Sequence, residues 1–235
     1  MAQAYPSKPI RIVVAYTPAG TTDILARAIG QKLTEAWGQS VIVDNRPGAN
    51  GNIGTEYAAK ATPDGYTLLM TTAAPHGVNP GLYPDLPYKP LTDFTPVTAL
   101  AQVPTVLVTH PSVEAKNLAE FVALAKAKPG AISYGSAGQG SVHHLTMAVF
   151  AARAGIDVLH APYRGGTALV GALMKGEVQS GWSGIPNVKP LIEQGTLKVL
   201  AISTEQRSKS LPNVPTAIEQ GFKGFDIATM IGVQL

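Results

Sequence analysis

The chain has 235 residues, of which 45% are hydrophobic and only 14% are charged, and its formal net charge is +3. This composition excludes a disordered chain, and the scattered basic residues and the lack of a long apolar run argue against nucleic-acid binding and a membrane span. Because the sequence contains no cysteine, it has no disulfides, thiolate metal sites or cysteine nucleophiles.

Strand and helix patterns alternate along the first part of the chain. The expected strands are 10–16, 41–43 and 66–70, and the expected helices are 21–37 and 53–60. Thr21 or Thr22 is expected to cap the first helix, because threonine hydroxyls accept hydrogen bonds from helix-start amides. This β-α-β-α-β order predicts a parallel sheet with helices on both faces.

A second alternation follows a proline-rich stretch at 75–96. The expected strands are 105–109, 132–134, 158–160, 178–182 and 197–202, and the expected helices are 117–127, 144–154, 168–175 and 188–194. A further apolar strand pattern at 225–235 ends the sequence. We therefore expect an α/β protein with two tandem lobes, residues 1–103 with 224–235 and residues 104–223.

Three loops rich in glycine and hydroxyl side chains follow predicted strands and precede predicted helices, at 17–23, 48–54 and 136–141. Ligands of open α/β sheets bind at the carboxyl ends of the strands, and amides at a helix start favour an anion. The scarcity of cations in these loops favours a small carboxylate over a polyphosphate. The alternative is purely structural, since such turns need glycine, serine and threonine for backbone and capping reasons alone.

Cofactor, metal and catalytic motifs are not recognisable. The glycines at 48–54 have the spacing G-x-x-G-x-x-G, which differs from a dinucleotide fingerprint, and no phosphate-binding Gly-Lys-Ser/Thr is present. Gly135-Ser136-Ala137-Gly138 falls short of a nucleophile elbow. The adjacent His143 and His144 would point about 100° apart on a helix, and the other histidines are isolated in the sequence. We therefore expect a binding protein without cofactor or metal, and not an enzyme.

The turn Pro162-Tyr163-Arg164 places an aromatic ring and a cation at a predicted strand end of the second lobe. The functional interpretation is a tyrosine wall beside the ligand. The structural interpretation is a packed tyrosine and a solvated arginine, and the sequence does not decide between them.

Motifs along nearly the whole chain closely resemble the Bug family, the extracytoplasmic solute receptors of tripartite tricarboxylate transporters. The motifs that carry the resemblance are Tyr5-Pro6-Ser7-Lys8-Pro9-Ile10-Arg11, Asp44-Asn45-Arg46-Pro47-Gly48-Ala49, Gly51-Asn52-Ile53-Gly54, Pro63-Asp64-Gly65-Tyr66-Thr67-Leu68, Leu86-Pro87-Tyr88, Ala125-Lys126-Ala127-Lys128-Pro129-Gly130, Pro162-Tyr163-Arg164-Gly165 and Leu211-Pro212-Asn213-Val214-Pro215-Thr216.

The resemblance implies a type II periplasmic-binding-protein fold, in which two α/β lobes joined by a hinge close on a ligand. It implies a monomer that captures a di- or tricarboxylate, an acidic amino acid or an aromatic acid and delivers it to the membrane subunits of a tripartite transporter. The alternatives are a receptor that presents its ligand to a signalling system and, less favoured, an enzyme on the same scaffold. No nucleic acid is expected as a partner.

The resemblance and the loops together predict the ligand-binding residues. They are Thr17, Pro18, Ala19, Gly20, Thr21, Thr22, Asp23, Gly48, Ala49, Asn50, Gly51, Thr71, Thr72, Ala73, His76, Ser136, Gly138, Gly140, Ser141, His144, Pro162, Tyr163, Trp182 and Ser183.

The sequence departs from the family pattern in the second lobe, where Gln179 and Ser183 stand at positions that are commonly Asp. This weakens the case for a ligand with an amino group, and Trp182 indicates room for an apolar or aromatic body. The family also continues beyond residue 235, so we expect a first lobe truncated at its C-terminus. Ala2-Gln3-Ala4 resembles a signal-peptidase site with no signal peptide before it, which fits a periplasmic protein.

Overall fold

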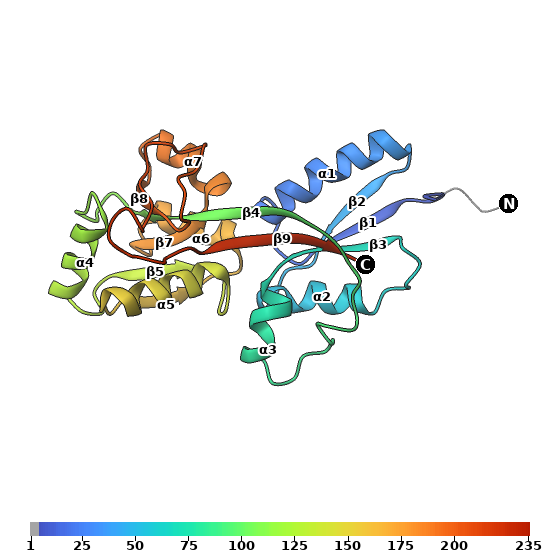
Figure 1. Cartoon of the computed structure of the whole chain (residues 1–235), viewed down its shortest axis with the longest axis horizontal. Helices are drawn as coiled ribbons and strands as arrows, with labels where there is room; N and C mark the ends of the chain where they lie inside the picture. The colour runs from blue at the N-terminus through green and yellow to red at the C-terminus, as the bar shows by residue number, and fades with distance from the viewer. Residues whose placement is uncertain (1–4) are drawn as a thin grey trace. The chain divides into compact units, whose positions relative to one another are not determined.

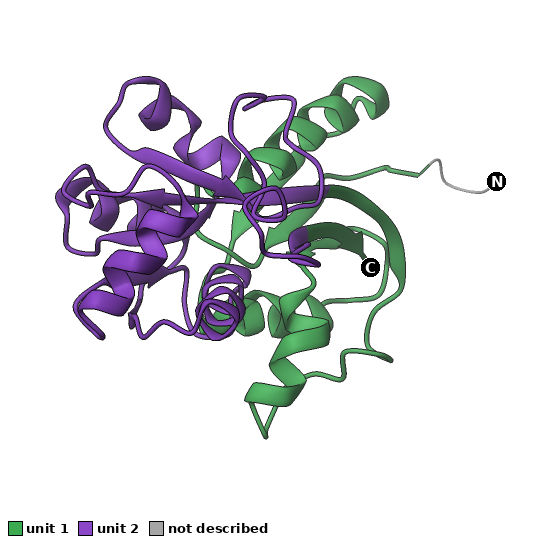
Figure 2. Cartoon of the chain, turned by 60° about the vertical axis from the view of Figure 1, so that its left-hand side comes forward, with its two compact units in different colours: residues 1–101, 230–235 green, residues 102–229 purple. Residues whose placement is uncertain are grey.

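The computed structural model describes residues 5–235, so the Ala2-Gln3-Ala4 tripeptide lies outside the described residues. The chain forms two compact units, shown in different colours in Figure 2. Unit 1 comprises residues 1–101 and 230–235, and unit 2 comprises residues 102–229. The chain therefore passes from one unit to the other twice, once within strand β4 (Pro96–Thr109) and once within strand β9 (Ala228–Gln234).

Unit 1 is built on strands β1 (Ile10–Val14), β2 (Val41–Asn45) and β3 (Thr67–Thr72). Strand β1 lies between β2 and β3 and pairs with both in parallel, and β9 pairs antiparallel with the free edge of β3. The β-branched run of β1 is almost completely buried, as expected for a central strand covered on both faces.

Helices α1 (Thr21–Trp37) and α2 (Asn52–Ala59) connect these strands and lie on opposite sides of the sheet (Figure 1). Gly20, in extended conformation, is the N-cap of α1, and no side chain caps this helix. The prediction that Thr21 or Thr22 caps α1 is therefore wrong. Both threonines already belong to the first turn of the helix, because the helical conformation starts one residue earlier than their hydroxyls suggested.

The proline-rich connection contains two short helices that the sequence did not indicate. A π-helical turn η2 (Ala74–Val78) runs directly into α3 (Asn79–Leu82), and each element has a proline in its first turn. Proline is tolerated there because the first amides of a helix have no acceptor within the helix. These two elements place Asn79 and Pro75 in the interior of unit 1, each buried.

Unit 2 holds a mixed sheet with the strand order β4-β7-β5-β6, and β8 (Lys198–Ile202) pairs with the other edge of β4. Strands β5 (Ser133–Ser136), β6 (Leu159–Pro162) and β7 (Ser180–Gly184) run parallel, and β4 is antiparallel to β7 and β8. The carboxyl ends of the three parallel strands thus share one edge of the sheet.

Four helices cover this sheet: α4 (Leu118–Ala127), α5 (Val142–Ala154), α6 (Gly166–Lys175) and α7 (Ile185–Glu193). The core consists of two clusters, one with α4 and α5 and one with α6 and α7. Leu107 of β4 belongs to the first cluster, whereas Val106 and Val108 belong to the second. Successive side chains of a strand point to opposite faces, so β4 is covered on both faces.

The two-unit α/β fold and its order of strands and helices agree with the sequence prediction. The largest difference is β4, which begins at Pro96 rather than near residue 105. Its early residues are mostly exposed and include no continuous apolar run, so hydrophobic patterning did not reveal them. Among the described residues, no helix is long and apolar enough to cross a membrane.

A glycine in α2 tests how closely this helix must approach β1. An alanine Cβ at position 54 would lie 2.7 Å from the Cα of Ala15 and 2.8 Å from the carbonyl oxygen of Arg46. We expect Gly54→Ala to lower the free energy of unfolding by roughly 1–3 kcal/mol, because backbone atoms cannot rotate away. The matched control is Gly171→Ala in α6, where no heavy atom lies within 4 Å of the new Cβ. This variant should gain about 0.5–1 kcal/mol from helix propensity. Urea unfolding measures both, and equal effects would contradict the close packing of α2.

Candidate functional site

The loop after β1 is fixed by one buried carboxylate. Asp23, 2% exposed, accepts hydrogen bonds from the backbone N–H of Ala19 (2.9 Å), from Arg27 Nε (3.0 Å) and from Asn45 Nδ2 (3.0 Å). Burial alone would raise the pKa of Asp23, but the hydrogen bonds from Arg27, Ala19 and Asn45 outweigh it and hold the pKa below its usual value. Asp23 is therefore a charged support of the loop, and its negative charge is balanced within unit 1.

The loop after β2 has an unusual backbone. Gly48, Ala49, Asn50 and Gly51 have φ angles of 137°, 46°, 51° and 91°, so four consecutive residues lie in the region that side chains with a Cβ rarely adopt. Glycine and asparagine tolerate this region, whereas alanine does not. The loop thus presents polar backbone in a strained form, a feature that is typical of binding sites.

The three loops of unit 1 meet at the carboxyl ends of β1, β2 and β3. The hydroxyl of Tyr16 lies 2.6 Å from Thr72 Oγ1, and its carbonyl accepts a hydrogen bond from Asn45 Nδ2 at 3.1 Å. Gly51 faces the Tyr16 hydroxyl and the ring of Pro75, both close to 3 Å from where a Cβ would stand. Residues that the sequence predicted separately after three strands are therefore neighbours in unit 1.

The segment after β3 contributes residues of differing exposure. Thr71 is 2% exposed and Thr72 is half-buried, whereas Ala73 is exposed. The ring of His76 packs edge-on against Phe94 at 5.2 Å between centroids. Burial lowers the pKa of His76, and its Nε2 has no hydrogen-bond partner among the described residues. His76 is thus a neutral side chain held against an aromatic ring.

In unit 2, the loop after β5 is tied to the start of α5. The hydroxyl of Ser141 caps the helix by accepting a hydrogen bond from the His144 N–H at 3.3 Å, and the Gly140 N–H donates to His144 Nδ1 at 3.1 Å. Ser136 is fully buried, and its hydroxyl accepts from the Gly138 N–H at 3.2 Å. The loop therefore folds tightly over the first turn of α5.

His160, which the sequence did not single out, lies directly beside this loop. Its Nε2 is 2.7 Å from Ser136 Oγ, and its ring stacks on His144 at 4.2 Å and on Tyr134 at 4.8 Å between centroids. Burial, with a smaller contribution from His144, lowers the pKa of His160 to about 4. The contact depends on the parallel pairing of β5 with β6, which aligns Tyr134 with His160, so spacing along the chain could not indicate it.

Ser136 Oγ and His160 Nε2 are as close as a nucleophile and its general base would be. Their environment, however, is not that of a catalytic pair. The Ser136 hydroxyl is completely buried and also lies 3.1 Å from the Gly138 carbonyl oxygen, to which it donates. Among the described residues, no group of three His, Cys, Asp or Glu side chains could hold a metal ion. The pair joins β5 to β6 at the start of the loop that follows β5.

The remaining predicted residues of unit 2 divide into two groups. Pro162 is exposed and Tyr163 half-buried, and the Tyr163 N–H donates to the Ser136 carbonyl at 3.0 Å, which joins this turn to the loop after β5. In contrast, Trp182 is fully buried in the aromatic core, with its ring 5.5 Å from that of Phe225. Ser183 is also fully buried, and its hydroxyl has no partner among the described residues. The Trp182 ring therefore fills the core of unit 2 and provides no open wall for a ligand.

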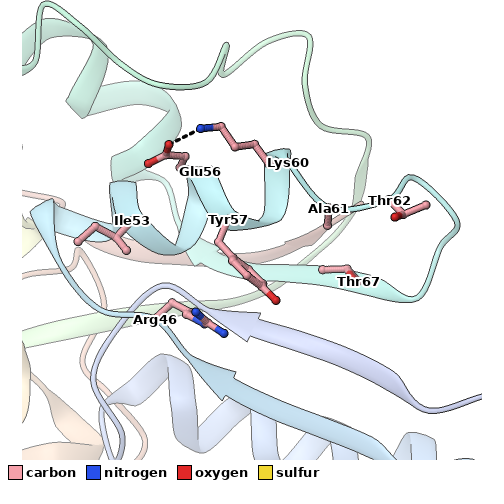
Figure 3. Close-up of a pocket in the computed structure, with 8 residues that line it drawn as sticks. All are labelled: Arg46, Ile53, Glu56, Tyr57, Lys60, Ala61, Thr62 and Thr67. Atoms are coloured by element: carbon pink, nitrogen blue, oxygen red, sulfur yellow. Dashed lines mark hydrogen bonds and ion pairs between the residues drawn. The ribbon is translucent and has the colours of Figure 1, made fainter.

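A separate groove runs along α2 of unit 1 (Figure 3). Its lining residues are Arg46, Ile53, Glu56, Tyr57, Lys60, Ala61, Thr62 and Thr67. Its charges are already paired, since Lys60 binds Glu56, and Arg46 binds Asp44 and covers the Tyr57 ring at 4.1 Å. None of the predicted ligand-binding residues lines this groove, so it is distinct from the loops described above.

Two α/β units joined by two strand crossings, each with glycine- and hydroxyl-rich loops at the carboxyl ends of parallel strands, define a bilobed solute-binding protein. Residues 25–234 match the family described as the tripartite tricarboxylate transporter family receptor, and the chain belongs to this family. Members of this family are periplasmic solute receptors that serve tripartite transporters.

Individual relatives agree with this assignment. The chain is 40% identical over 225 residues to protein BugT of Bordetella pertussis, a match that covers 95% of this chain and 69% of BugT. Among solved structures, R. palustris Rpa4515 with adipate has a TM-score of 0.96 and 36% identity, with 98% of this chain and 77% of that chain covered. MatC (Rpa3494) from Rhodopseudomonas palustris with bound malate has a TM-score of 0.90 and 30% identity, with 98% and 78% covered.

Two half-buried histidines of unit 2 predict a pH dependence of stability. Burial lowers the pKa of His143 to about 4, and that of His160 is also about 4. An unfolded histidine titrates near 6.5, so the unfolded chain binds more protons as the pH falls below that value, and stability is lost between about pH 6.5 and pH 4. We expect a loss of roughly 2–4 kcal/mol between pH 7 and pH 5, measured by urea unfolding.

His143→Gln should reduce this pH dependence, because it removes one of the two imidazoles whose pKa is lowered to about 4. His110→Gln is the matched control, since the His110 ring contacts Ser112 and takes no part in the stack of His144, His160 and Tyr134. An identical loss of stability between pH 7 and pH 5 in the wild type and His143→Gln would refute the contribution of His143 to the pH dependence.

Proposed function

We propose that this chain captures a small organic carboxylate in the periplasm and delivers it to the membrane subunits of a tripartite transporter, as a monomer and without catalysing a reaction. The observation that carries the proposal is the pairing of family membership with loops that offer neutral hydrogen-bond donors at helix starts in both units. The Rhodopseudomonas palustris relatives that hold adipate and malate support this class of ligand.

Helix starts supply the attraction for the negative charge. Helices α1 and α5, of 17 and 13 residues, begin directly after two of these loops. The first amides of a helix have no acceptor within the helix and carry a partial positive charge. A carboxylate placed there gains hydrogen bonds from several amides at once. The Ala49 and Asn50 amides of the loop after β2 would add donors of the same kind.

Formal charges near the loops of unit 1 are already balanced. Arg27 is paired with Asp23, and Arg46 is paired with Asp44. A ligand held by neutral donors would keep its charge without displacing an existing ion pair. This arrangement favours a ligand with one or two carboxylates over a polyphosphate, which usually needs lysine or arginine.

We further propose that the loops of both units take part in ligand binding and that binding shifts the chain from an open to a closed state. The proposed ligand-binding residues are the predicted loop residues Thr17–Asp23, Gly48–Gly51, Thr71–Ala73, His76, Ser136–Ser141, His144 and Pro162–Tyr163. Trp182 is left out because its ring fills the core, and buried Ser183 is assigned a supporting place beneath the turn. The two strand crossings are the segments where a hinge motion would occur.

A thermal-shift screen tests the ligand class. We expect adipate, malate or another di- or tricarboxylate to raise the melting temperature, because binding to the folded state stabilises it by mass action. The corresponding diamides should give no shift, since they lack the negative charge that the helix-start amides attract. Isothermal titration calorimetry on the hits provides the affinity. Equal shifts with an acid and its amide would count against recognition of the carboxylate.

Small-angle scattering tests this change of conformation. If the ligand binds a closed state better than an open one, it shifts the population toward the closed state. We therefore expect a smaller radius of gyration with a saturating carboxylate than with its amide at the same concentration. An unchanged radius with every carboxylate that binds would contradict closure and leave carboxylate binding itself intact.

A further inference from the structure

The left-handed loop at 48–51 requires support from elsewhere in unit 1. Left-handed backbone is intrinsically unfavourable for a residue with a Cβ, and Ala49 and Asn50 occupy it consecutively. Such a backbone persists only where the surrounding structure determines it. Two backbone hydrogen bonds support the loop locally: the Gly51 N–H donates to the Gly48 carbonyl oxygen at 3.0 Å, and the Asn52 N–H donates to the Ala49 carbonyl oxygen. Side chains add further support.

Asn79 supplies that support from the first residue of α3. Its Nδ2 donates to the Asn50 carbonyl oxygen at 3.1 Å and to Asn52 Oδ1 at 2.6 Å, and its Oδ1 accepts from Asn50 Nδ2 at 2.8 Å. A primary amide has two hydrogens, and both are used here. The single Asn79 side chain is therefore hydrogen-bonded to the backbone of Asn50, to the side chain of Asn50 and to Asn52, the residue that begins α2.

Tyr88 forms the second layer of the network. Its hydroxyl lies 2.6 Å from Asn52 Oδ1 and 2.9 Å from the Pro75 carbonyl oxygen, so it joins the start of α2 to η2. Tyr88 is 5% exposed, and burial raises the pKa of its hydroxyl to about 12. The hydroxyl is therefore a neutral donor at every physiological pH. The ring packs edge-on against Phe94 at 6.0 Å.

Asn79 is 0% exposed, so it would not touch a ligand held at the surface of the loop. We propose that Asn79, assisted by Tyr88, is a positioning residue that sets ligand affinity by holding the loop at 48–51 in its left-handed form. The inference rests on the proposed function, because the loop is one of the proposed ligand-binding segments, and it adds two residues that the ligand does not contact.

The mechanism is a population effect. A loop released from Asn79 would leave the left-handed form for part of the time, because that form is intrinsically costly. Only the fraction in the binding form accepts ligand, and the apparent dissociation constant rises by the inverse of that fraction. The association rate falls by the same factor, whereas the dissociation rate stays unchanged, because the bound state is the same.

The experiment compares Asn79→Ala with Asn117→Ala. Asn117 caps α4 in unit 2, where its Oδ1 accepts from the Glu120 N–H, so its removal also lowers stability without touching the loop. The readouts are amide hydrogen exchange across residues 48–52 of the unliganded protein, and the association and dissociation rates of adipate and malate by stopped-flow fluorescence.

We expect Asn79→Ala to accelerate exchange across 48–52 and to slow association about 3- to 30-fold at an unchanged dissociation rate. Asn117→Ala should change neither quantity relative to the wild type. Tyr88→Phe removes one hydroxyl, keeps the ring and should give a smaller effect of the same kind. It also serves as the test if Asn79→Ala does not fold.

Two failures are distinguishable. If the wild type binds carboxylates and the Asn79 and Tyr88 variants bind with wild-type association rates, the positioning role is overturned and the proposed function stands. If the wild type binds neither adipate, malate nor any other carboxylate of the thermal-shift panel, the proposed function is overturned, and the inference that depends on it falls with it.

Discussion

The site of unit 1 depends on one constraint. The chain must pass from the parallel strand β2 into helix α2 through a connection with left-handed backbone. After β2 the chain must reach the start of α2, which lies so close to β1 that Gly54 has no room for a side chain. The four residues from Gly48 to Gly51 make this connection at positive φ. The close packing of α2 therefore fixes where the loop ends, and the asparagine network fixes its form.

In unit 2, a loop after a parallel strand is also held in place, but by different contacts. The loop after β5 is held by the buried Ser136 hydroxyl, by the Ser141 cap of α5 and by His160 from the neighbouring strand. Stacking of His160 on His144 and Tyr134 shields the imidazoles from water. Because burial disfavours the charged form, the imidazoles stay neutral. In both units, side chains behind the loop carry the support, and the backbone in front remains available.

The sequence predicted the regular elements well because hydrophobic periodicity reports burial directly. The alternation of strand and helix patterns, and the loops at 17–23, 48–54 and 136–141, followed from local composition. Contacts between distant segments could not be predicted in this way. Asn79 sits in a proline-rich stretch with no periodicity, and His160 reaches Ser136 only because β5 pairs with β6. Trp182 appeared to mark an open pocket, whereas its strand is buried on both faces.

The internal balance of charge links these supports to recognition. Asp23 holds the loop after β1 and is itself neutralised by Arg27, and Asp44 is bound by both Arg11 and Arg46. Each of these carboxylates and cations already has an oppositely charged partner. The carboxylates are therefore not free to repel an approaching anion, and the cations are not free to attract any anion regardless of its shape. Selection among anions then depends on how many amides and hydroxyls their oxygens can reach, which is a matter of loop shape. Under the proposed function, residues that hold the loops, such as Asn79, would influence ligand selection through the shape of the loop.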